Sequence, residues 1–341
     1  MSTPPEVLFD RYFHAQTPSM QQIYQGKDDL ECLEIPGLKE ILLRLQQGLN
    51  FALANEREVP EHRSHPPFHF DYIRSSLSNA IAFRHDGYSF IGVTIPLIET
   101  LMTLCGRLSR SIDLLSLLGL DAAEDISDGL GLVLFHIAIF FIVSHEYTHI
   151  VHGHSVMGFE GSTLRHEIHD DGYAGGLSEQ ALEADADSYA IYHIMGNWIA
   201  GVERSEGLTV LNRNTISLAD QDDLLFSLVV VAIGAYFMLR PVPQLDAESV
   251  YKLSHPPQAA RLNSLMDTAI AWCRQNRGDL AQRMTEQWFN RLLSHVASAI
   301  WEANDSRHQN WMQQVDFLRS ADGAEYLGKL RTDRDQYRAS L

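Results

Sequence analysis

The sequence predicts an α+β protein that is mainly helical and carries a small edge sheet or hairpin. Three observations predict this class. Apolar residues recur at helical spacing over much of the 341-residue chain. Two long apolar runs, residues 129–143 and 224–239, are typical of buried helices. Residues 79–95 combine short apolar and β-branched runs with a turn between them, which is typical of two paired strands.

The composition is that of a folded globular protein. Hydrophobic residues make up 45% of the chain and charged residues 21%. The formal net charge is −18, from 44 acidic and 26 basic residues, and the sequence has no Lys/Arg-rich run. Such a charge repels a phosphate backbone, so we expect no nucleic acid partner. The three cysteines, which are far apart, predict neither a disulfide framework nor a CxxC metal site. Together with the absence of a signal-like apolar segment at the start, they predict a cytoplasmic protein.

The first 70 residues predict a helical extension. Leucine and isoleucine recur at helical spacing from Leu38 to Leu49, and a Pro/His-rich break follows at residues 60–67. After this break, Asn79–Phe83 and residues 89–95 form two short strand-like runs. The segment Arg84-His-Asp-Gly-Tyr lies between them. The pattern therefore predicts a hairpin.

The two apolar runs predict core helices. Each is shorter than the roughly 20 residues that cross a bilayer, so we expect no membrane association. A membrane-embedded protein remains an alternative, and solubility without detergent would exclude it. The first run leads into the motif described below, with Gly153 as its C-terminal signal. The second run stops before Pro241 and Pro243, and residues 178–195 and 259–299 also have helical spacing.

His145, Glu146 and His149 form an HExxH motif at the end of the first apolar run. The two histidines are four residues apart, so both imidazoles lie on one helix face and can hold one Zn²⁺. Glu146 then lies beside the metal, where its carboxylate can accept a proton from a zinc-bound water. Burying these three side chains is costly unless they have a partner, and zinc is such a partner. The alternative is that they only make hydrogen bonds in the core.

A catalytic zinc site needs a third protein ligand. The metzincin pattern requires glycine at 152 and histidine at 155, where this sequence has His152 and Ser155, so that class is excluded. Glu183, on a second helical segment, can supply the ligand. Asp187, four residues later, can accept a hydrogen bond from a ligand imidazole. The alternative is a solvated acidic stripe, to which we expect Asp185 to belong.

Four motifs in order resemble the M48 family of zinc peptidases, the gluzincin group with the HtpX-like and Ste24-like enzymes. Asn79-Ala-Ile-Ala-Phe with residues 90–98 resembles that family's edge strand. His145-Glu-Tyr-Thr-His149 with His154 resembles its HExxHxxxxH helix. Glu183-Ala-Asp-Ala-Asp187 resembles its ExxAD helix, and Ser254-His255-Pro-Pro-Gln-Ala-Ala-Arg261 resembles its HPxxxxR segment.

The resemblance implies a zincin-like metallopeptidase core over residues 71–270, with helical extensions at residues 1–70 and 271–341. It implies one Zn²⁺ per chain. The implied roles are metal ligation by His145, His149 and Glu183, catalysis by Glu146 and His255, orientation by Asp187, and substrate binding along the edge strand by Asn79, Ala80, Ile81 and Ala82. Arg261 is implied to anchor its segment against acidic groups near the site. His152, His154, His166 and His169 are expected to be surface histidines, and a second metal site is the alternative.

The predicted function is that of a zinc metalloendopeptidase, which hydrolyses peptide bonds with a zinc-activated water and Glu146 as the base. Its partner is then a protein or peptide substrate. One alternative is a dedicated host-target or stress and defence peptidase that cuts one specific protein. Another is a non-catalytic zinc-binding scaffold. The sequence predicts no oligomeric state.

Overall fold

The computed structural model describes residues 3–32, 37–56, 65–154, 176–201, 203–240, 242–301 and 305–340. The chain forms two compact units. The first unit comprises Met1–Thr100 with Glu146–Asp170, and the second comprises Leu101–His145 with Asp171–Leu341. Helix α6 (Glu124–Val151) is one continuous helix, and its last turns belong to the first unit.

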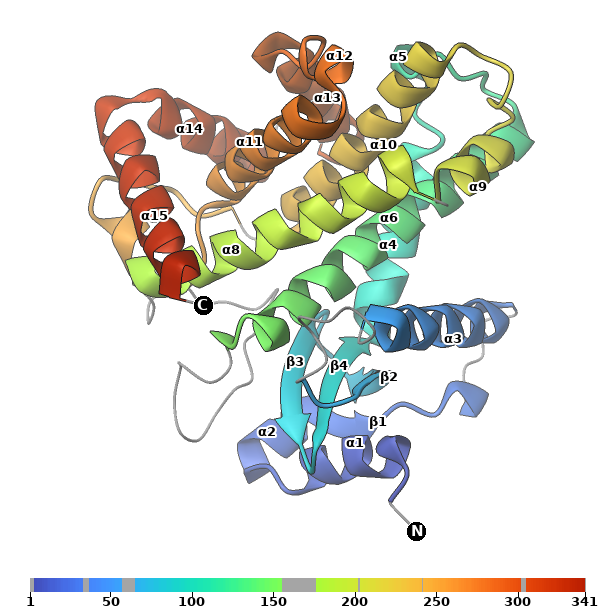
Figure 1. Cartoon of the computed structure of the whole chain (residues 1–341), viewed down its shortest axis with the longest axis vertical. Helices are drawn as coiled ribbons and strands as arrows, with labels where there is room; N and C mark the ends of the chain where they lie inside the picture. Colours follow the sequence, from blue (N-terminus) through green and yellow to red (C-terminus); the bar gives the residue numbers. More distant parts are fainter. Residues whose placement is uncertain are drawn as a thin grey trace. The chain divides into compact units, whose positions relative to one another are not determined.

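A four-stranded sheet forms the centre of the first unit (Figure 1). Its strands are β1 (Tyr24–Lys27), β2 (Phe68–Ser75), β3 (Ala80–His85) and β4 (Tyr88–Thr94). They lie in the order β1-β2-β4-β3, with β2 and β4 parallel and the two outer pairs antiparallel. Among the described residues, β3 therefore pairs with β4 alone and forms an edge of the sheet.

The hairpin predicted from residues 79–95 is confirmed. Ala80 faces Val93 and His85 faces Tyr88, so two residues close the turn. These are Asp86 and Gly87, whose φ angles of 45° and 80° are the left-handed values that a two-residue hairpin turn requires. Strand β1 was not predicted. Its four residues do not alternate in hydropathy, and Gly26 adopts a φ of 103°.

Helix α1 (Pro5–His14) packs on the sheet through an aromatic core. The rings of Phe9 and Phe83 are 5.6 Å apart, and Tyr12 stacks on Phe83 at 3.9 Å. The predicted boundary between residues 70 and 71 falls inside β2. The first helix therefore shares its core with the hairpin.

Helix α3 (Leu38–Glu56) covers part of β2, and the short elements α2 (Pro18–Ile23) and η1 (Leu30–Cys32) lie before it in the chain. The Asn50 side chain accepts from Phe70 N at 2.8 Å and donates to Phe70 O at 3.0 Å. It thus satisfies strand backbone groups at a position where β1 has already ended. The Tyr72 hydroxyl adds a bond to Leu42 O at 2.9 Å.

The second unit is helical in its described residues. Helix α8 contacts α11 and α15, and α10 contacts α13 (Figure 1). Gly234 permits the close approach of α10 to α13, because a Cβ there would lie 2.6 Å from Leu293 Cδ2. The predicted boundary between residues 270 and 271 falls inside α11. Besides most of α6, the helices are α4 (Ile95–Leu108, which begins in the first unit), α5 (Ile112–Leu117), α8 (Leu177–Ile194), the π-helical η3 (Met195–Ala200), α9 (Glu203–Val210), α10 (Leu218–Leu239), η4 (Ser249–Lys252), α11 (Gln258–Asn276), α12 (Gly278–Ala281), α13 (Glu286–Ile300), α14 (Ser306–Arg319) and α15 (Ala321–Ser340).

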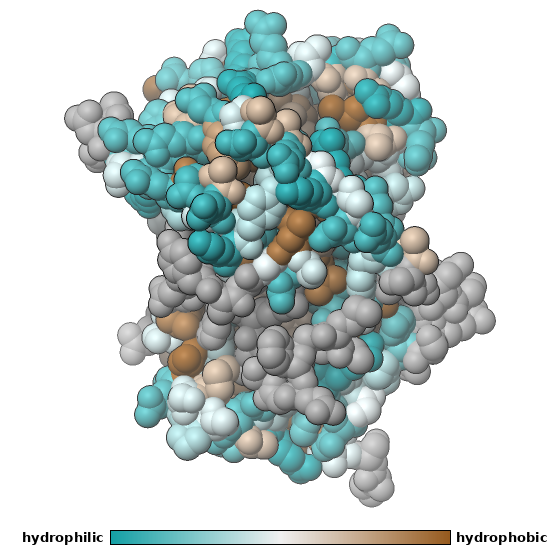
Figure 2. All heavy atoms as spheres, turned by 90° about the vertical axis from the view of Figure 1, so that its left-hand side faces the viewer, coloured by the Kyte–Doolittle hydropathy of each residue, from teal (hydrophilic) through white to brown (hydrophobic). Residues whose placement is uncertain are grey.

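Two described helices, α6 and α10, are long and apolar enough to cross a membrane by length and composition. The most apolar 18-residue window is 67% buried within the protein in α6 and 89% buried in α10. A core helix of a globular unit has the same properties, so these helices are weak evidence for a membrane protein. The face seen in Figure 2 is mainly hydrophilic, with apolar residues in small separate patches.

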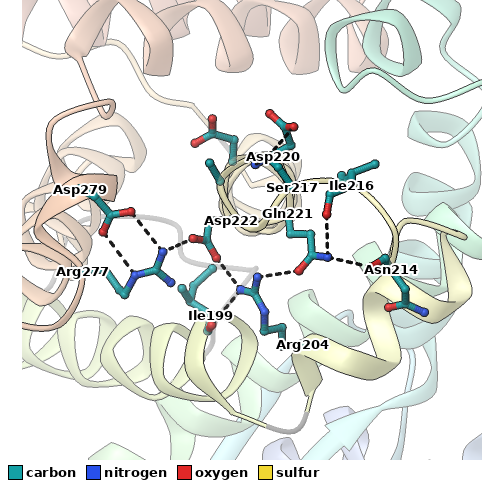
Figure 3. A network of polar contacts seen from close by, with 12 residues as sticks. Ile199, Arg204, Asn214, Ile216, Ser217, Asp220, Gln221, Asp222, Arg277 and Asp279 are labelled. Carbon is teal, nitrogen blue, oxygen red and sulfur yellow. Dashed lines mark hydrogen bonds and ion pairs between the residues drawn. The ribbon is translucent and has the colours of Figure 1, made fainter.

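A partly buried ionic network joins α9, α10 and the α11–α12 connection (Figure 3). Asp222, which is fully buried, accepts from Arg204 Nη1 at 2.5 Å and pairs with Arg277 through its other oxygen. Arg277 also pairs with Asp279 at 3.3 Å. Both oxygens of Asp222 are thus occupied by arginine donors.

The described residues are therefore mainly helical with one small sheet, as the sequence predicts. The zincin-like nature of the core stays a prediction.

Candidate metal centre

Helix α6 presents the HExxH motif on its last two turns. His145, Glu146 and His149 are 2%, 4% and 7% exposed, so a charge on any of them needs a partner. The helix ends as predicted: Gly153 has a φ of 71° and its N–H donates to Ile150 O at 3.1 Å. The structure thus places both histidines on one buried turn of a continuous helix.

Helix α8 places a carboxylate at each ring nitrogen of His145. Glu183 Oε2 lies 3.3 Å from His145 Nε2, and Asp187 Oδ1 lies 3.0 Å from Nδ1. Glu183 and Asp187 are four residues apart on one face of α8 and are 1% and 0% exposed. Both predicted residues thus lie within 3.3 Å of His145, while their roles as metal ligand and as acceptor for a ligand imidazole stay predictions.

Arg261 of α11 holds the Asp187 carboxylate in place. Its Nε and Nη2 both donate to Asp187 at 2.7 Å, which is the two-pronged geometry of a strong arginine–carboxylate pair. The guanidinium also lies over the ring of Phe237, 4.6 Å from its centre. The predicted anchor is therefore confirmed, and the acidic group that it holds is Asp187.

The buried charges shift two pKa values in opposite directions. Burial alone would raise the pKa of Asp187, but the charge and hydrogen bonds of Arg261, with a contribution from His145, lower it below its ordinary value. Burial alone would lower the pKa of His145, but its bonds to Asp187 and Glu183 raise it to about 9. A metal ion at His145 Nε2 would compete with this proton.

His255 lies next to Glu183, at the same carboxylate oxygen that faces His145. Its Nε2 is 3.5 Å from Glu183 Oε2, and Ser254 Oγ is 2.9 Å from its Nδ1. The segment that carries both residues leads into α11. His255 therefore lies next to the predicted third ligand, close enough to influence it.

Four histidines outside the motif have different positions. His166 and His169 lie outside the described residues. His152 is half-buried, with its ring 5.7 Å from that of His154. His154 is only 1% exposed, so the prediction of a surface histidine is wrong there. Its Nδ1 lies 2.9 Å from His149 Nδ1.

His145, His149 and Glu183 form a buried group that could hold a metal ion, with their ligand atoms within 4.8 Å of one another. Two imidazoles and one carboxylate are a donor set of catalytic zinc sites. A metal-binding histidine usually donates its other ring N–H to a nearby acceptor, which orients the ring. The Asp187 carboxylate lies at His145 Nδ1, where such an acceptor is expected. The residues present therefore fit zinc.

Comparison with known proteins bears on the same part of the chain. Residues 121–271 match the Peptidase U49 family. The match indicates a peptidase family, and it does not point to M48. No curated protein and no solved structure matches the chain. The segment matched to U49 contains every residue that the sequence assigns to metal binding and catalysis, from His145 to His255, and also Arg261.

The predicted substrate strand, Asn79–Ala82, lies outside the segment that matches U49. Thr94 N donates to Asn79 O, so Asn79 forms a hydrogen-bonded pair with β4. Such pairs alternate along an antiparallel ladder, and Ile81 is therefore the next one. It follows that Ala80 and Ala82 direct their backbone N–H and C=O groups away from β4, toward the edge.

Two contacts within the first unit fix the last turn of α6 against the sheet. Arg84 of β3 donates through Nη2 to Ile150 O at 3.0 Å, and the rings of Phe68 and Tyr147 are 4.8 Å apart. Glu146 lies on the preceding turn of the same helix. No sequence pattern predicts these contacts, because they join residues far apart in the chain.

Tyr24 of β1 is a further residue that the sequence did not single out. Its hydroxyl accepts from Asn79 Nδ2 at 2.6 Å, so this side chain of the predicted substrate strand is already engaged. Burial raises the pKa of Tyr24 to about 12; the Asn79 bond opposes this rise and the charge of Glu146 adds to it.

Asp185 differs from its prediction. It was expected in a solvated acidic stripe, but it is fully buried and pairs with Arg338 of α15.

Proposed function

We propose that this chain is a zinc-dependent metalloendopeptidase. The observation that carries the proposal is the pair of buried carboxylates on α8, one at each ring nitrogen of His145. A histidine held in this way has one nitrogen oriented by Asp187 and the other facing a potential ligand, Glu183. The Peptidase U49 match over the same residues supports the peptidase class.

In this proposal His145, His149 and Glu183 hold one Zn²⁺. When bound, zinc supplies a Lewis acid that polarises the scissile carbonyl and lowers the pKa of a water molecule. Arg261 holds Asp187 ionised, and Asp187 holds the proton on His145 Nδ1, so that Nε2 is the nitrogen that faces the metal. His255, whose Nε2 lies 3.5 Å from Glu183 Oε2, is placed to act in catalysis from beside that carboxylate.

Glu146 is the general base. Because Glu146 directly follows His145 on α6, its side chain points to a neighbouring side of the helix rather than to the face of the two histidines. Its carboxylate would therefore lie beside the bound metal. There it takes a proton from the attacking water and gives it to the leaving amine. Arg84 and Phe68 hold the last turn of the same helix.

The substrate, a protein or peptide in extended form, binds along β3, an edge strand among the described residues, whose Ala80 and Ala82 are 0% and 8% exposed without substrate. Ala80 and Ala82 offer outward backbone groups that pair with substrate backbone, in the manner of an added strand. Such binding recognises the backbone first and side chains second. The M48-like core and a cytoplasmic location are part of the same proposal, and all three cysteines are free, as a reducing compartment predicts.

Metal analysis combined with a proteolysis assay tests this function. Purified wild-type protein, Glu146→Gln and the exposed control Glu99→Gln are each incubated with the proteome of the source cell, and new protein N-termini are counted. We expect one zinc per chain in all three proteins. We expect cleavage to fall by about 10²- to 10⁴-fold in Glu146→Gln alone, because only that variant lacks the base.

Two outcomes would contradict the proposal. Persistent cleavage in Glu146→Gln would exclude this mechanism. Stoichiometric zinc without any new N-terminus in the wild-type digest would favour a scaffold. A digest of casein alongside the proteome separates a general peptidase from one dedicated to a single target.

A further inference from the structure

His149 and His154 contact each other within the first unit through their Nδ1 atoms. Their Nδ1 atoms are 2.9 Å apart, and their rings pack edge to face, with centres 4.9 Å apart. Both side chains are buried, His149 at 7% and His154 at 1% exposure. A buried pair at this distance is a hydrogen bond, so one Nδ1 carries the proton and the other accepts it.

The turn at the end of α6 creates this contact. Histidines five residues apart do not share a helix face, so a continued helix would separate them. Gly153 has a φ of 71°, which bends the chain back at the point where the helix stops. Glycine adopts this conformation without steric cost. The bend at Gly153 places the ring of the next residue, His154, against the ring of His149.

A metal-binding role for His149 decides the direction of this bond. Its Nδ1 is occupied by His154, so Nε2 is the nitrogen left to bind the metal. A neutral imidazole that binds metal through Nε2 carries its proton on Nδ1 and donates it. His154 Nδ1 must then accept, and His154 carries its own proton on Nε2.

We propose that His154 is a positioning residue, which accepts the Nδ1–H of His149 and thereby directs His149 Nε2 toward the metal. This inference rests on the proposed zinc site. It gives the second histidine what Asp187 gives the first: a buried acceptor at Nδ1, 3.0 Å away for His145 and 2.9 Å away for His149. The two acceptors differ in charge, since Asp187 is a carboxylate and His154 an imidazole.

Zinc affinity of matched variants tests this role. Asparagine at position 154 places its amide oxygen as many bonds from Cα as Nδ1, so His154→Asn keeps an acceptor, whereas His154→Leu removes it. His152→Leu is the control for loss of a nearby histidine. Each protein is stripped of metal, its folding is checked by circular dichroism, and its Zn²⁺ affinity is measured by competition with a chromophoric chelator.

We expect His154→Leu to weaken zinc binding by about 10- to 100-fold, the usual effect of removing a partner of a metal ligand. His154→Asn and His152→Leu should both remain close to wild type. Wild-type affinity in His154→Leu would overturn the inference while leaving the proposed function intact. A wild-type protein that binds no zinc would overturn both. Two zinc ions per chain, falling to one in His154→Leu, would make His154 a ligand and also overturn the positioning role.

Nitrogen NMR of the histidine rings gives a second readout, which does not depend on folding stability. In the zinc-loaded wild type we expect the His149 proton on Nδ1 and the His154 proton on Nε2. If His149 instead carries its proton on Nε2 with the metal on Nδ1, the inference is wrong. His154→Asn should keep the His149 tautomer, which a merely space-filling role of His154 would not require.

Discussion

Asp187 and Asp222 are two of the fully buried aspartates of the second unit that pair with arginine, and they differ in what else they contact. Asp222 lies between Arg204 and Arg277, so both of its oxygens face arginine (Figure 3). Asp187 receives both of its arginine bonds from Arg261 alone and also contacts His145 at 3.0 Å. Both are strong buried ion pairs, and by charge alone they look alike.

The difference lies in whether the network ends on arginine or continues to an imidazole. Around Asp222 each acceptor is occupied, and the arginines lead to Asp279 and the side chain of Gln221. Around Asp187 the network passes through His145 to Glu183 and His255. A buried carboxylate therefore indicates a functional site only when its partners are groups that can bind a metal or move a proton.

Neutralising Asp222 should give the largest change, and it should affect stability alone. Asp222→Asn leaves Arg204 and Arg277 with an uncharged partner in a buried place. Breaking a buried pair costs about 3 to 5 kcal/mol, and we expect about 3 kcal/mol, because the two arginine side chains keep 17% and 25% exposure. The free energy of unfolding is measured by denaturant titration. Zinc affinity of the folded protein should stay at the wild-type value, and a large loss of it would break the comparison.

The same change at Asp187 should instead weaken the metal site. In Asp187→Asn the amide oxygen can still accept from Arg261, but the amide nitrogen cannot accept the proton on His145 Nδ1. We expect zinc affinity to fall by about 10- to 100-fold, together with a loss of stability from the weakened Arg261 pair. Chelator competition on the folded protein measures the first effect separately from the second. Equal zinc affinities in Asp187→Asn and Asp222→Asn would show that Asp187 is only a structural partner.

Local spacing was enough to predict the parts of the site that lie on single helices. His145 with His149, and Glu183 with Asp187, are each four residues apart, so a helical period alone brings each pair to one face. The hairpin followed from an Asp-Gly turn between two apolar runs. These relations depend on neighbours in the chain.

The missed features depend on residues far apart in the chain or on an exact backbone turn. The burial of Asp185 depends on Arg338, 153 residues away, and the role of Arg84 depends on a helix end 66 residues away. The position of His154 requires the left-handed φ of Gly153, and a helical pattern cannot supply it. Strand β1 is too short and too polar for its periodicity to stand out.

The smallest expected effect concerns the first unit and separates substrate binding from metal binding. Ala82 directs its backbone N–H away from β4, so Ala82→Pro removes one donor from the outer side of β3 without breaking the ladder with β4. Loss of one hydrogen bond costs about 1 kcal/mol, so we expect kcat/KM for a peptide substrate to fall about fivefold with zinc content unchanged. Ala82→Ser, which keeps the N–H, is the control. An unchanged kcat/KM in Ala82→Pro would mean that substrate does not pair with this edge, even if Asp187 and Asp222 behave as described.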